Sequence, residues 1–419
     1  MEDTEDASNA KFVNASDTGE IPSFNGDEKA KATDFANYFC SYAQLYHQKQ
    51  MLADHNRMAA YHSAILGNSS VFKDKVVMDV GTGSGILAVW AAQAGARKVY
   101  AVEYTDMAKY AKRVMTANGV DNVVTVIQGA VEDIELPMEE DGLDPEGPVD
   151  IMISEWMGYF LLRESMMDSV IRARDKFLNK KTGLMFPSHC SMFVAPVRDE
   201  DDRKQNNNEY AGAMSDWHDF AETTRNMYGV DMDILEKDFD REQKEYYLLS
   251  SRWTELQPEV LLAEPKMIKQ FDMATCTLEE ARGITAGEPD AVFCFDINGT
   301  RNLGPVSAIA GWFTSDFRSR TDEHAAIAPK IENPSFLSTG PEQGYTHWGQ
   351  QTFYLLSPLP LLKGEITRLE GSIEMTRTKE NARLYNCKFK IQNSRRRLGQ
   401  EDGQVLMKSP VQENVYQIP

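Results

Sequence analysis

The first regular pattern along the chain is helical and covers about residues 35–66. Apolar side chains recur there every seven positions in two adjacent rows, which together predict one buried stripe on a helix. The rows are Leu45, Leu52, Ala59 and Leu66, and Met51, Met58 and Ile65. Gly67 followed by Asn68 predicts the C-terminal end of this helix.

Short apolar runs alternate with helical patterns from residue 76 onward. The runs predict strands at 76–80, 98–103, 123–129 and 149–154, with helices after the first, second and fourth. Such alternation is typical of a parallel sheet with right-handed crossovers. The strands are apolar throughout, as expected when both faces of the sheet are covered. The sequence therefore predicts an α/β domain that covers residues 35–187.

The pattern changes after Phe186-Pro187, where strand-like runs recur with few helical patterns between them. They predict an antiparallel β domain over residues 188–419. One polar and partly helical segment, at about 199–240, interrupts the strands and is expected to project from this domain as an insertion. The strand-like runs lie at 190–197, 291–297, 307–317, 350–357 and 382–392.

Length and composition support two folded domains preceded by a tail. With 419 residues, 42% of them apolar, the chain is too long for one ordinary core. Residues 1–34 are rich in Asp, Glu, Ser, Asn and Gly, so we expect a disordered acidic tail and no signal peptide. Because no apolar run approaches the roughly 20 residues that span a bilayer, we expect no membrane association.

The formal net charge of −20 changes the expected partners. Such a chain is expected to repel nucleic acid and to attract basic peptides, although an acidic surface can serve solubility alone. The five cysteines are scattered, with no Cys-x-x-Cys pair and no histidine at ligand spacing. They indicate reduced thiols in the cytoplasm or the nucleus, and no metal site is expected.

A glycine-rich loop lies between the first predicted strand and the helix after it, from Asp79 to Gly85 in the form D-x-G-x-G-x-G. Gly81 and Gly83 allow a tight turn and a close approach of a ligand to the backbone. A dinucleotide-binding loop would need its third glycine at position 86, where Ile86 stands. The spacing is instead that of S-adenosylmethionine-dependent methyltransferases; a glycine-rich turn without a ligand is the alternative.

Two acids follow predicted strands on the side where such sheets bind ligands. Glu103 ends the second strand, about 20 residues after the glycine loop, where an acid can accept hydrogen bonds from ribose hydroxyls. Glu132 follows the third strand and could accept from the adenine amino group, although a glutamate at such a place is usually only solvated.

Two further carboxylates, Glu155 and Glu164, flank a glycine-containing turn directly after the fourth predicted strand. The residues between them are mainly aromatic or apolar, so the loop is expected to be partly buried. Two like charges in such a pocket oppose ionisation of one another, so a positive group should lie between them. A planar guanidinium can meet two carboxylates through its fork of N–H donors.

The segment SEWMGYFLLRESM, at 154–166, resembles the double-E loop of protein arginine N-methyltransferases. The YFCSY sequence at 38–42 resembles the YFxxY helix of that family, and the residues at 345–348 resemble its THW loop. The resemblance runs from about Tyr38 to the C-terminal region. It implies a Rossmann-type S-adenosylmethionine-binding domain, a β-barrel domain and a helical dimerisation arm at about 199–240. The length of this arm is similar to that of a plant-type subgroup.

The resemblance also implies how the cofactor is bound. Arg57 would bind the carboxylate of S-adenosylmethionine, Glu103 its ribose and Glu132 its adenine. Gln48 stands where the family often carries a histidine, so it can donate a hydrogen bond but carries no charge. The other implied cofactor contacts are Tyr38, Tyr42, Met51, Asp79, Gly81, Gly83 and Met166.

For catalysis, the resemblance implies that Glu155 and Glu164 grip the substrate guanidinium and leave one terminal nitrogen more nucleophilic. His347 would pair with Asp54 and relay the proton outward. The alternative is a purely structural role, in which the histidine only packs between the domains. The remaining implied substrate contacts are Tyr42, Met51, Met157 and Trp348.

Taken from the residues and the resemblance together, the expected activity is methylation of arginine in proteins such as histones and Arg-Gly-rich proteins. Asymmetric dimethylarginine is the expected product, because Met51 and the THW loop match enzymes of that kind. We also expect a homodimer. One alternative is a methyltransferase for small molecules or nucleic acid. The other is a non-catalytic adaptor, which should have lost Glu155, Glu164 or the glycine loop.

Overall fold

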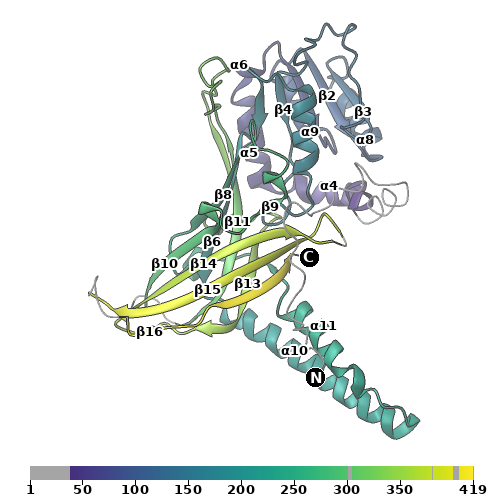
Figure 1. Cartoon of the computed structure of the whole chain (residues 1–419). Coiled ribbons are helices and arrows are strands. Elements are labelled where there is room, and N and C mark those ends of the chain that lie inside the picture. The colour runs from purple at the N-terminus through teal and green to yellow at the C-terminus, as the bar shows by residue number, and fades with distance from the viewer. Residues whose placement is uncertain (1–37, 301–303, 380, 400–404, 419) are drawn as a thin grey trace.

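The structure is a computed structural model that describes residues 38–300, 304–379, 381–399 and 405–418. An α/β domain lies at one end, a β domain follows it, and a pair of helices projects from the β domain (Figure 1). The acidic tail expected at 1–34 lies outside the described residues.

The N-terminal helical region is broken into short helices, where the sequence predicted one continuous stretch. They are α3 (Cys40–Tyr42), α4 (Leu45–Leu52), α5 (His55–Leu66) and α6 (Ser69–Phe72). The break before α5 places Asp54 at its N-cap, where the carboxylate accepts a hydrogen bond from the backbone N of Arg57 at 3.0 Å.

The predicted apolar stripe on this region is confirmed only in part. Ile65 is buried, and Met51, Leu52, Met58 and Leu66 are half-buried, but Leu45 is 53% exposed and Ala59 is exposed as well. The break after α4 shifts the helical phase, so the buried face of α5 consists of Arg57, Ala60, Tyr61, Ala64 and Ile65. Two of these side chains are polar, because this face of α5 lies against the candidate site described below.

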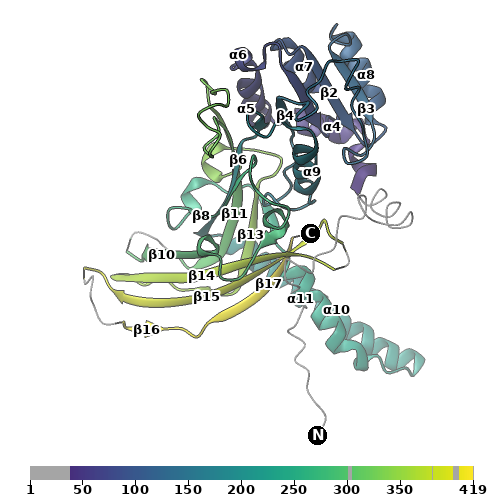
Figure 2. The ribbon, with the colours of Figure 1, turned by 45° about the horizontal axis from the view of Figure 1, so that its top comes forward.

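The α/β domain holds one parallel sheet in the order β3-β2-β1-β4-β5. Its strands are β1 (Val76–Val80), β2 (Lys98–Glu103), β3 (Val124–Gln128), β4 (Ile151–Ile153) and β5 (Leu184–Phe186). Helices α7 (Ile86–Gln93), α8 (Met107–Ala117) and α9 (Met167–Phe177) pack beside it (Figure 2). The four predicted strands are confirmed, whereas β5 was missed because only three residues form it. Since the strand order reverses between β1 and β4, the loops after these two strands meet at the usual ligand-binding position.

The β domain consists of two antiparallel sheets of six strands each, and the five predicted strands are confirmed. One sheet joins β9 (Gly283–Ile284), β10 (Val292–Asn298), β14 (Glu365–Arg377), β15 (Tyr385–Arg397), β16 (Met407–Lys408) and β17 (Gln412–Ile418). The other joins β6 (His189–Val197), β7 (Arg252–Thr254), β8 (Lys266–Asp272), β11 (Val306–Phe317), β12 (Ser335–Ser338) and β13 (Gln350–Leu359). The described strands thus pair as two sheets over a shared core.

The projecting segment is a helical hairpin of α10 (Glu200–Tyr228) and α11 (Glu236–Tyr247). Gly229 ends α10 with a φ of +67°, and Trp217 stacks on Phe239 with ring centroids 4.4 Å apart. The hairpin extends to Tyr247, beyond the boundary of about 240 that the sequence predicted, because polar positions continue without a stop signal through α11.

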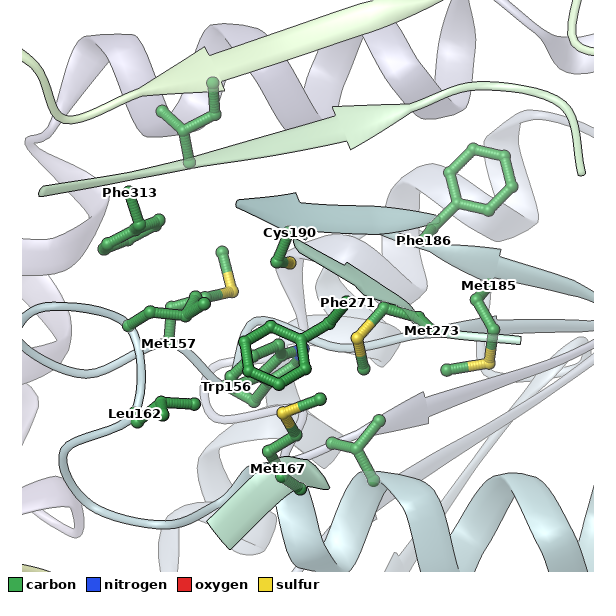
Figure 3. Packing of buried hydrophobic residues seen from close by; sticks show 14 of the residues in the cluster. Trp156, Met157, Leu162, Met167, Met185, Phe186, Cys190, Phe271, Met273 and Phe313 are labelled. Carbon is green, nitrogen blue, oxygen red and sulfur yellow. The ribbon is translucent and has the colours of Figure 1, made fainter. Parts of the chain in front are cut away.

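One apolar core runs across the boundary between the two domains (Figure 3). Trp156, Met157 and Leu162 of the acidic loop pack there with side chains from β5, β6, β11 and the β8 region. The labelled partners are Met167, Met185, Phe186, Cys190, Phe271, Met273 and Phe313. The acidic loop is therefore fixed by contacts with both domains. None of the described helices has the length and apolar character needed to cross a membrane.

Candidate active site

The glycine loop lies between β1 and α7, as predicted. Gly81 and Gly83 have φ angles of +73° and +55°, which favour glycine over any residue with a Cβ. A Cβ at Gly81 would meet nothing within 4 Å, so the loop leaves open space there for a ligand. A Cβ at Gly83 would lie 2.8 Å from Oε1 of Gln48. That oxygen accepts a hydrogen bond from the backbone N of Ser84 at 3.2 Å, so α4 holds the loop in place.

Glu103 ends β2 with its carboxylate fixed beside the loop. Oε2 accepts a hydrogen bond from the backbone N of Gly83 at 2.9 Å, and Oε1 accepts from the backbone N and Oγ1 of Thr105 at 2.8 and 2.7 Å. A carboxylate offers about four acceptor positions, so one more donor can still be bound. The residues present therefore fit a ligand with a hydroxyl group, such as the ribose of S-adenosylmethionine.

The other predicted cofactor residues surround this loop at different depths. Asp79 is fully buried and accepts a hydrogen bond from Oγ1 of Thr82 at 2.6 Å, so it braces the turn from behind. Burial raises the pKa of Asp79 to about 7. Glu132 lies half-exposed in the turn after β3, and Met51 and Met166 are half-buried.

The acidic loop after β4 is a tight hairpin with a strained backbone. The backbone N of Gly158 donates to the O of Leu161 at 3.1 Å, and this turn brings the two ends of the loop together. Phe160, Leu161, Glu164 and Ser165 all have positive φ angles, between +48° and +81°. Such angles are rare for residues other than glycine and are concentrated at functional sites.

Glu155 and Glu164 are each held by groups of this chain. Oε2 of Glu155 accepts hydrogen bonds from Nε and Nη2 of Arg57 at 3.0 and 2.8 Å. Oε2 of Glu164 accepts from the hydroxyls of Tyr38 and Tyr42 at 2.9 and 2.8 Å. Arg57, predicted to bind the carboxylate of the cofactor, therefore pairs here with one of the two catalytic candidates.

Burial raises the pKa of the Glu164 carboxyl, and the charge of Glu155 acts in the same direction, whereas Arg163 and the two tyrosine hydroxyls oppose the shift. Burial also raises the pKa of Tyr38 and Tyr42 well above the ordinary range, so both hydroxyls stay protonated and remain donors. The two acids thus influence one another, as expected for carboxylates that share one pocket.

His347 and Asp54 form the predicted pair across the domain boundary. Nδ1 of His347 lies 2.8 Å from Oδ2 of Asp54, and the backbone N of His347 donates to the same oxygen at 2.9 Å. Burial alone would raise the pKa of Asp54, but these hydrogen bonds and the N-cap bond from Arg57 hold it below its ordinary value. Trp348 donates from Nε1 to the O of Met157 at 2.8 Å, which fastens the THW loop to the acidic loop.

Comparison with known proteins decides the family. A family model of the arginine methyltransferase oligomerization subdomain matches residues 188–394, and one of ribosomal protein L11 methyltransferase matches residues 65–162. Protein arginine N-methyltransferase PRMT10 of Arabidopsis thaliana is 45% identical over 366 residues, covering 86% of this chain and 88% of that protein. The chain belongs to the protein arginine N-methyltransferase family. PRMT10 of Oryza sativa subsp. japonica is 47% identical over 361 residues, with 86% and 88% of the two chains covered.

Solved structures of the family share this fold. The crystal structure of Arabidopsis thaliana protein arginine methyltransferase 10, described as uniquely open, gives a TM-score of 0.79 at 40% identity and covers 91% of this chain and all of that one. A Trypanosoma brucei PRMT1 enzyme–prozyme complex with AdoHcy gives 0.67 at 27% identity, covering 90% of this chain and 100% of the other. The resemblance seen in the sequence is thereby confirmed, and with it an S-adenosylmethionine-dependent arginine methyltransferase.

A methyltransferase of this family needs its acidic loop held firmly, and two interdomain contacts that do so were missed from the sequence. Arg383, in the turn between β14 and β15, donates from Nη1 to the O of Glu164 at 2.7 Å. Its guanidinium lies 4.0 Å from the ring centroid of Tyr38. Asp168 of α9 accepts from Nη1 and Nη2 of Arg377 at 3.1 and 2.5 Å, and both side chains are almost fully buried. Because the partners in each contact lie far apart in the sequence, no local pattern could predict these contacts.

No group of three or more His, Cys, Asp or Glu side chains among the described residues could hold a metal ion. All five cysteines are unpaired, and Cys190, Cys276 and Cys387 are buried.

Proposed function

We propose that this methyltransferase acts on arginine in basic proteins such as histone tails and Arg-Gly-rich proteins, and forms monomethylarginine and then asymmetric dimethylarginine. The observation that carries the proposal is the pair Glu155 and Glu164, two largely buried carboxylates that the hairpin of the acidic loop brings close enough for their charges to interact. Such a pair fits a planar cation better than a neutral or anionic group.

The roles of the residues follow from their contacts. Oε2 of Glu155 accepts the hydrogen bonds of Arg57, and Oε2 of Glu164 accepts those of the two tyrosines, so the Oε1 atoms are the oxygens that would bind a substrate guanidinium. Binding through the carboxylates would localise charge on one side of the guanidinium and leave one terminal nitrogen more nucleophilic. S-adenosylmethionine supplies the electrophilic methyl group when bound. Positioning of the two reactants is then the main contribution of the protein, worth roughly 7–11 kcal/mol in favourable cases.

The proton lost by the substrate nitrogen would leave through His347. Asp54 fixes the His347 ring by its contact with Nδ1, so Nε2 is the nitrogen left to accept a proton. Gly81 and Gly83 of the glycine loop, together with Glu103 at the end of β2, would hold the nucleoside, and Glu132 would approach the adenine. Met51 and the residues around His347 match the family pattern of enzymes that make the asymmetric product, which supports that choice.

We further propose a homodimer in which the α10–α11 hairpin is the dimerisation arm. The support is a group of exposed apolar side chains near the tip of the hairpin, where nothing in the described chain covers them, and the match to an oligomerization subdomain. These side chains are Met227, Tyr228, Val230, Ile234 and Leu235. Light scattering of the wild type and of a Met227→Asp/Ile234→Asp variant tests this: a monomeric and fully active wild type would refute it. A location in cytoplasm and nucleus, suggested by the unpaired cysteines, can be tested by imaging a fluorescent fusion.

The decisive experiment is transfer of labelled methyl groups to an Arg-Gly-rich peptide, with the product identified by mass spectrometry. Glu155→Gln and a peptide with lysine in place of arginine serve as controls. We expect asymmetric dimethylarginine from the wild type alone and no transfer to lysine. If the protein bound the cofactor but left arginine unmodified, the assignment of these substrates would be wrong, and nucleic acids and small molecules would be tested instead.

A further inference from the structure

Arg163 directly precedes Glu164, and its guanidinium already lies where a substrate guanidinium would have to bind. Nη1 of Arg163 is 3.5 Å from Oε1 of Glu164. The other oxygen, Oε2, accepts the hydrogen bonds from Tyr38 and Tyr42. Arg163 therefore faces the one oxygen of Glu164 that the tyrosines leave for a substrate.

The guanidinium of Arg163 also lies over an aromatic ring. The guanidinium carbon of Arg163 is 5.6 Å from the ring centroid of Tyr159, a half-buried residue at the turn of the acidic loop. An aromatic face attracts a cation. Arg163 can therefore leave Glu164 without losing all of its stabilising contacts.

Arg163 is also held more loosely than the other arginine of the site. Its side chain is 23% exposed, and its Nε is enclosed but has no hydrogen-bond partner among the described residues. Arg57, by contrast, donates two hydrogen bonds to Glu155 at 3.0 and 2.8 Å. A cation held by a 3.5 Å charge contact and a ring face can be displaced at low cost.

We propose that Arg163 is an internal competitor of the substrate, a guanidinium that covers Oε1 of Glu164 in the empty site and withdraws from that oxygen, while keeping its contact with Tyr159, when a substrate arginine enters. This inference rests on the proposed role of Glu155 and Glu164 in binding the substrate. Every guanidine must then displace a cation before it can bind. Because this cost is the same for all of them, it weakens the binding of polypeptide arginine and of small guanidines by the same factor.

Removal of Arg163 would have two effects of opposite sign. Oε1 of Glu164 would be free at once, so guanidines would bind more tightly wherever Glu164 is ionised. The charge of Arg163 also lowers the pKa of Glu164 against the effect of burial, so its loss would move the acidic limb of activity to higher pH. The other titratable groups that face Glu164 are Tyr38, Tyr42, Tyr159 and Glu155, and Arg383 approaches its backbone O.

The test compares Arg163→Gln and Arg163→Lys with the wild type in steady-state methyl transfer between about pH 6 and pH 9, which brackets the near-neutral pH at which most enzymes work. The substrates are an Arg-Gly peptide and N-acetylarginine amide, and cofactor-loaded full-length protein is used throughout. Arg113→Gln is the matched control, because Arg113 lies exposed on α8 over the ring of Tyr110. Thermal unfolding of each variant shows that it is folded.

For Arg163→Gln we expect the KM of both substrates to fall by the same factor, about two- to fivefold near pH 8, with the acidic limb displaced upward. Arg163→Lys should lie between it and the wild type, and Arg113→Gln should match the wild type. Suppose that the wild type methylates arginine and Glu164→Gln does not. Unchanged KM values for Arg163→Gln, or a loss of kcat at the wild-type KM, would then overturn this inference but leave the proposed function standing. A wild type without activity on arginine would overturn both this inference and the proposed function.

Discussion

The buried ion pair between Asp168 and Arg377 joins the two domains, and its loss should destabilise the protein more than the loss of any surface pair. The two side chains are 2% and 0% exposed, and Arg282 lies 3.3 Å from the same carboxylate. Asp168→Asn keeps the size of the side chain but leaves Arg377 buried without its counter-charge. Removing one partner of such a pair typically costs about 3–5 kcal/mol. We therefore expect Asp168→Asn to lose about that much unfolding free energy.

Urea unfolding followed by tryptophan fluorescence measures this loss, with each transition fitted separately because two domains need not unfold together. Asp106→Asn is the control, since its contact with Lys109 spans 3.9 Å between side chains that are 74% and 60% exposed, and should cost under about 1 kcal/mol. The double variant Asp168→Leu/Arg377→Met removes both charges and should be less destabilised than Asp168→Asn. If Asp168→Asn were no less stable than the control, the pair would not hold the domains together.

Three further outcomes follow from the site. Because hydrogen bonds hold the pKa of Asp54 below its ordinary value, its stabilising effect is present at neutral pH and is lost as the pH falls through that lowered value. In thermal melts, Asp54→Asn should therefore unfold more easily than the wild type at pH 7, and the difference should shrink as the medium is made more acidic. Because burial raises the pKa of Glu164 above 4.5, its charge costs stability at neutral pH, so Glu164→Gln should abolish methyl transfer without lowering the melting temperature. Gly83→Ala should weaken cofactor binding at least tenfold in calorimetry, since its φ is +55°, whereas Gly212→Ala, in open space on α10, should leave it unchanged.

The parts of the site that could be predicted are those with a local signal. The glycine loop is recognisable because strand, turn and helix follow one another within some 20 residues, and left-handed φ angles at Gly81 and Gly83 require glycine. The acidic loop is recognisable because the spacing of Glu155 and Glu164 is fixed by one hairpin. The pair of His347 and Asp54 came from the family resemblance alone, since nothing in the spacing of residues 293 positions apart could indicate it.

Two features of the fold were missed from the sequence. β14 was missed because one face of its 13 residues is largely polar, yet it pairs with β15 along its whole length. The break before α5 was missed because a seven-residue apolar repeat ran across it, while the carboxylate of Asp54 began the next helix as its N-cap. In both cases the prediction followed the apolar pattern and gave too little weight to a nearby local signal.

The β domain fixes the backbone that carries Glu164, the residue proposed to bind the substrate guanidinium. Glu164 and Ser165 have φ angles of +81° and +58°, and each such angle costs a residue other than glycine roughly 1–3 kcal/mol. The turn before β15 offsets this cost: the N of Glu164 donates to the O of Arg383 at 2.8 Å, and Oγ of Ser165 donates to the O of Ala382 at 2.6 Å. The α/β domain holds the carboxylate of Glu164 through Tyr38 and Tyr42, whereas the β domain holds the backbone of Glu164 and the side chain of Ser165. The residues proposed to bind the cofactor at the glycine loop are therefore positioned within one domain, whereas Glu164, proposed to bind the substrate, is positioned by both.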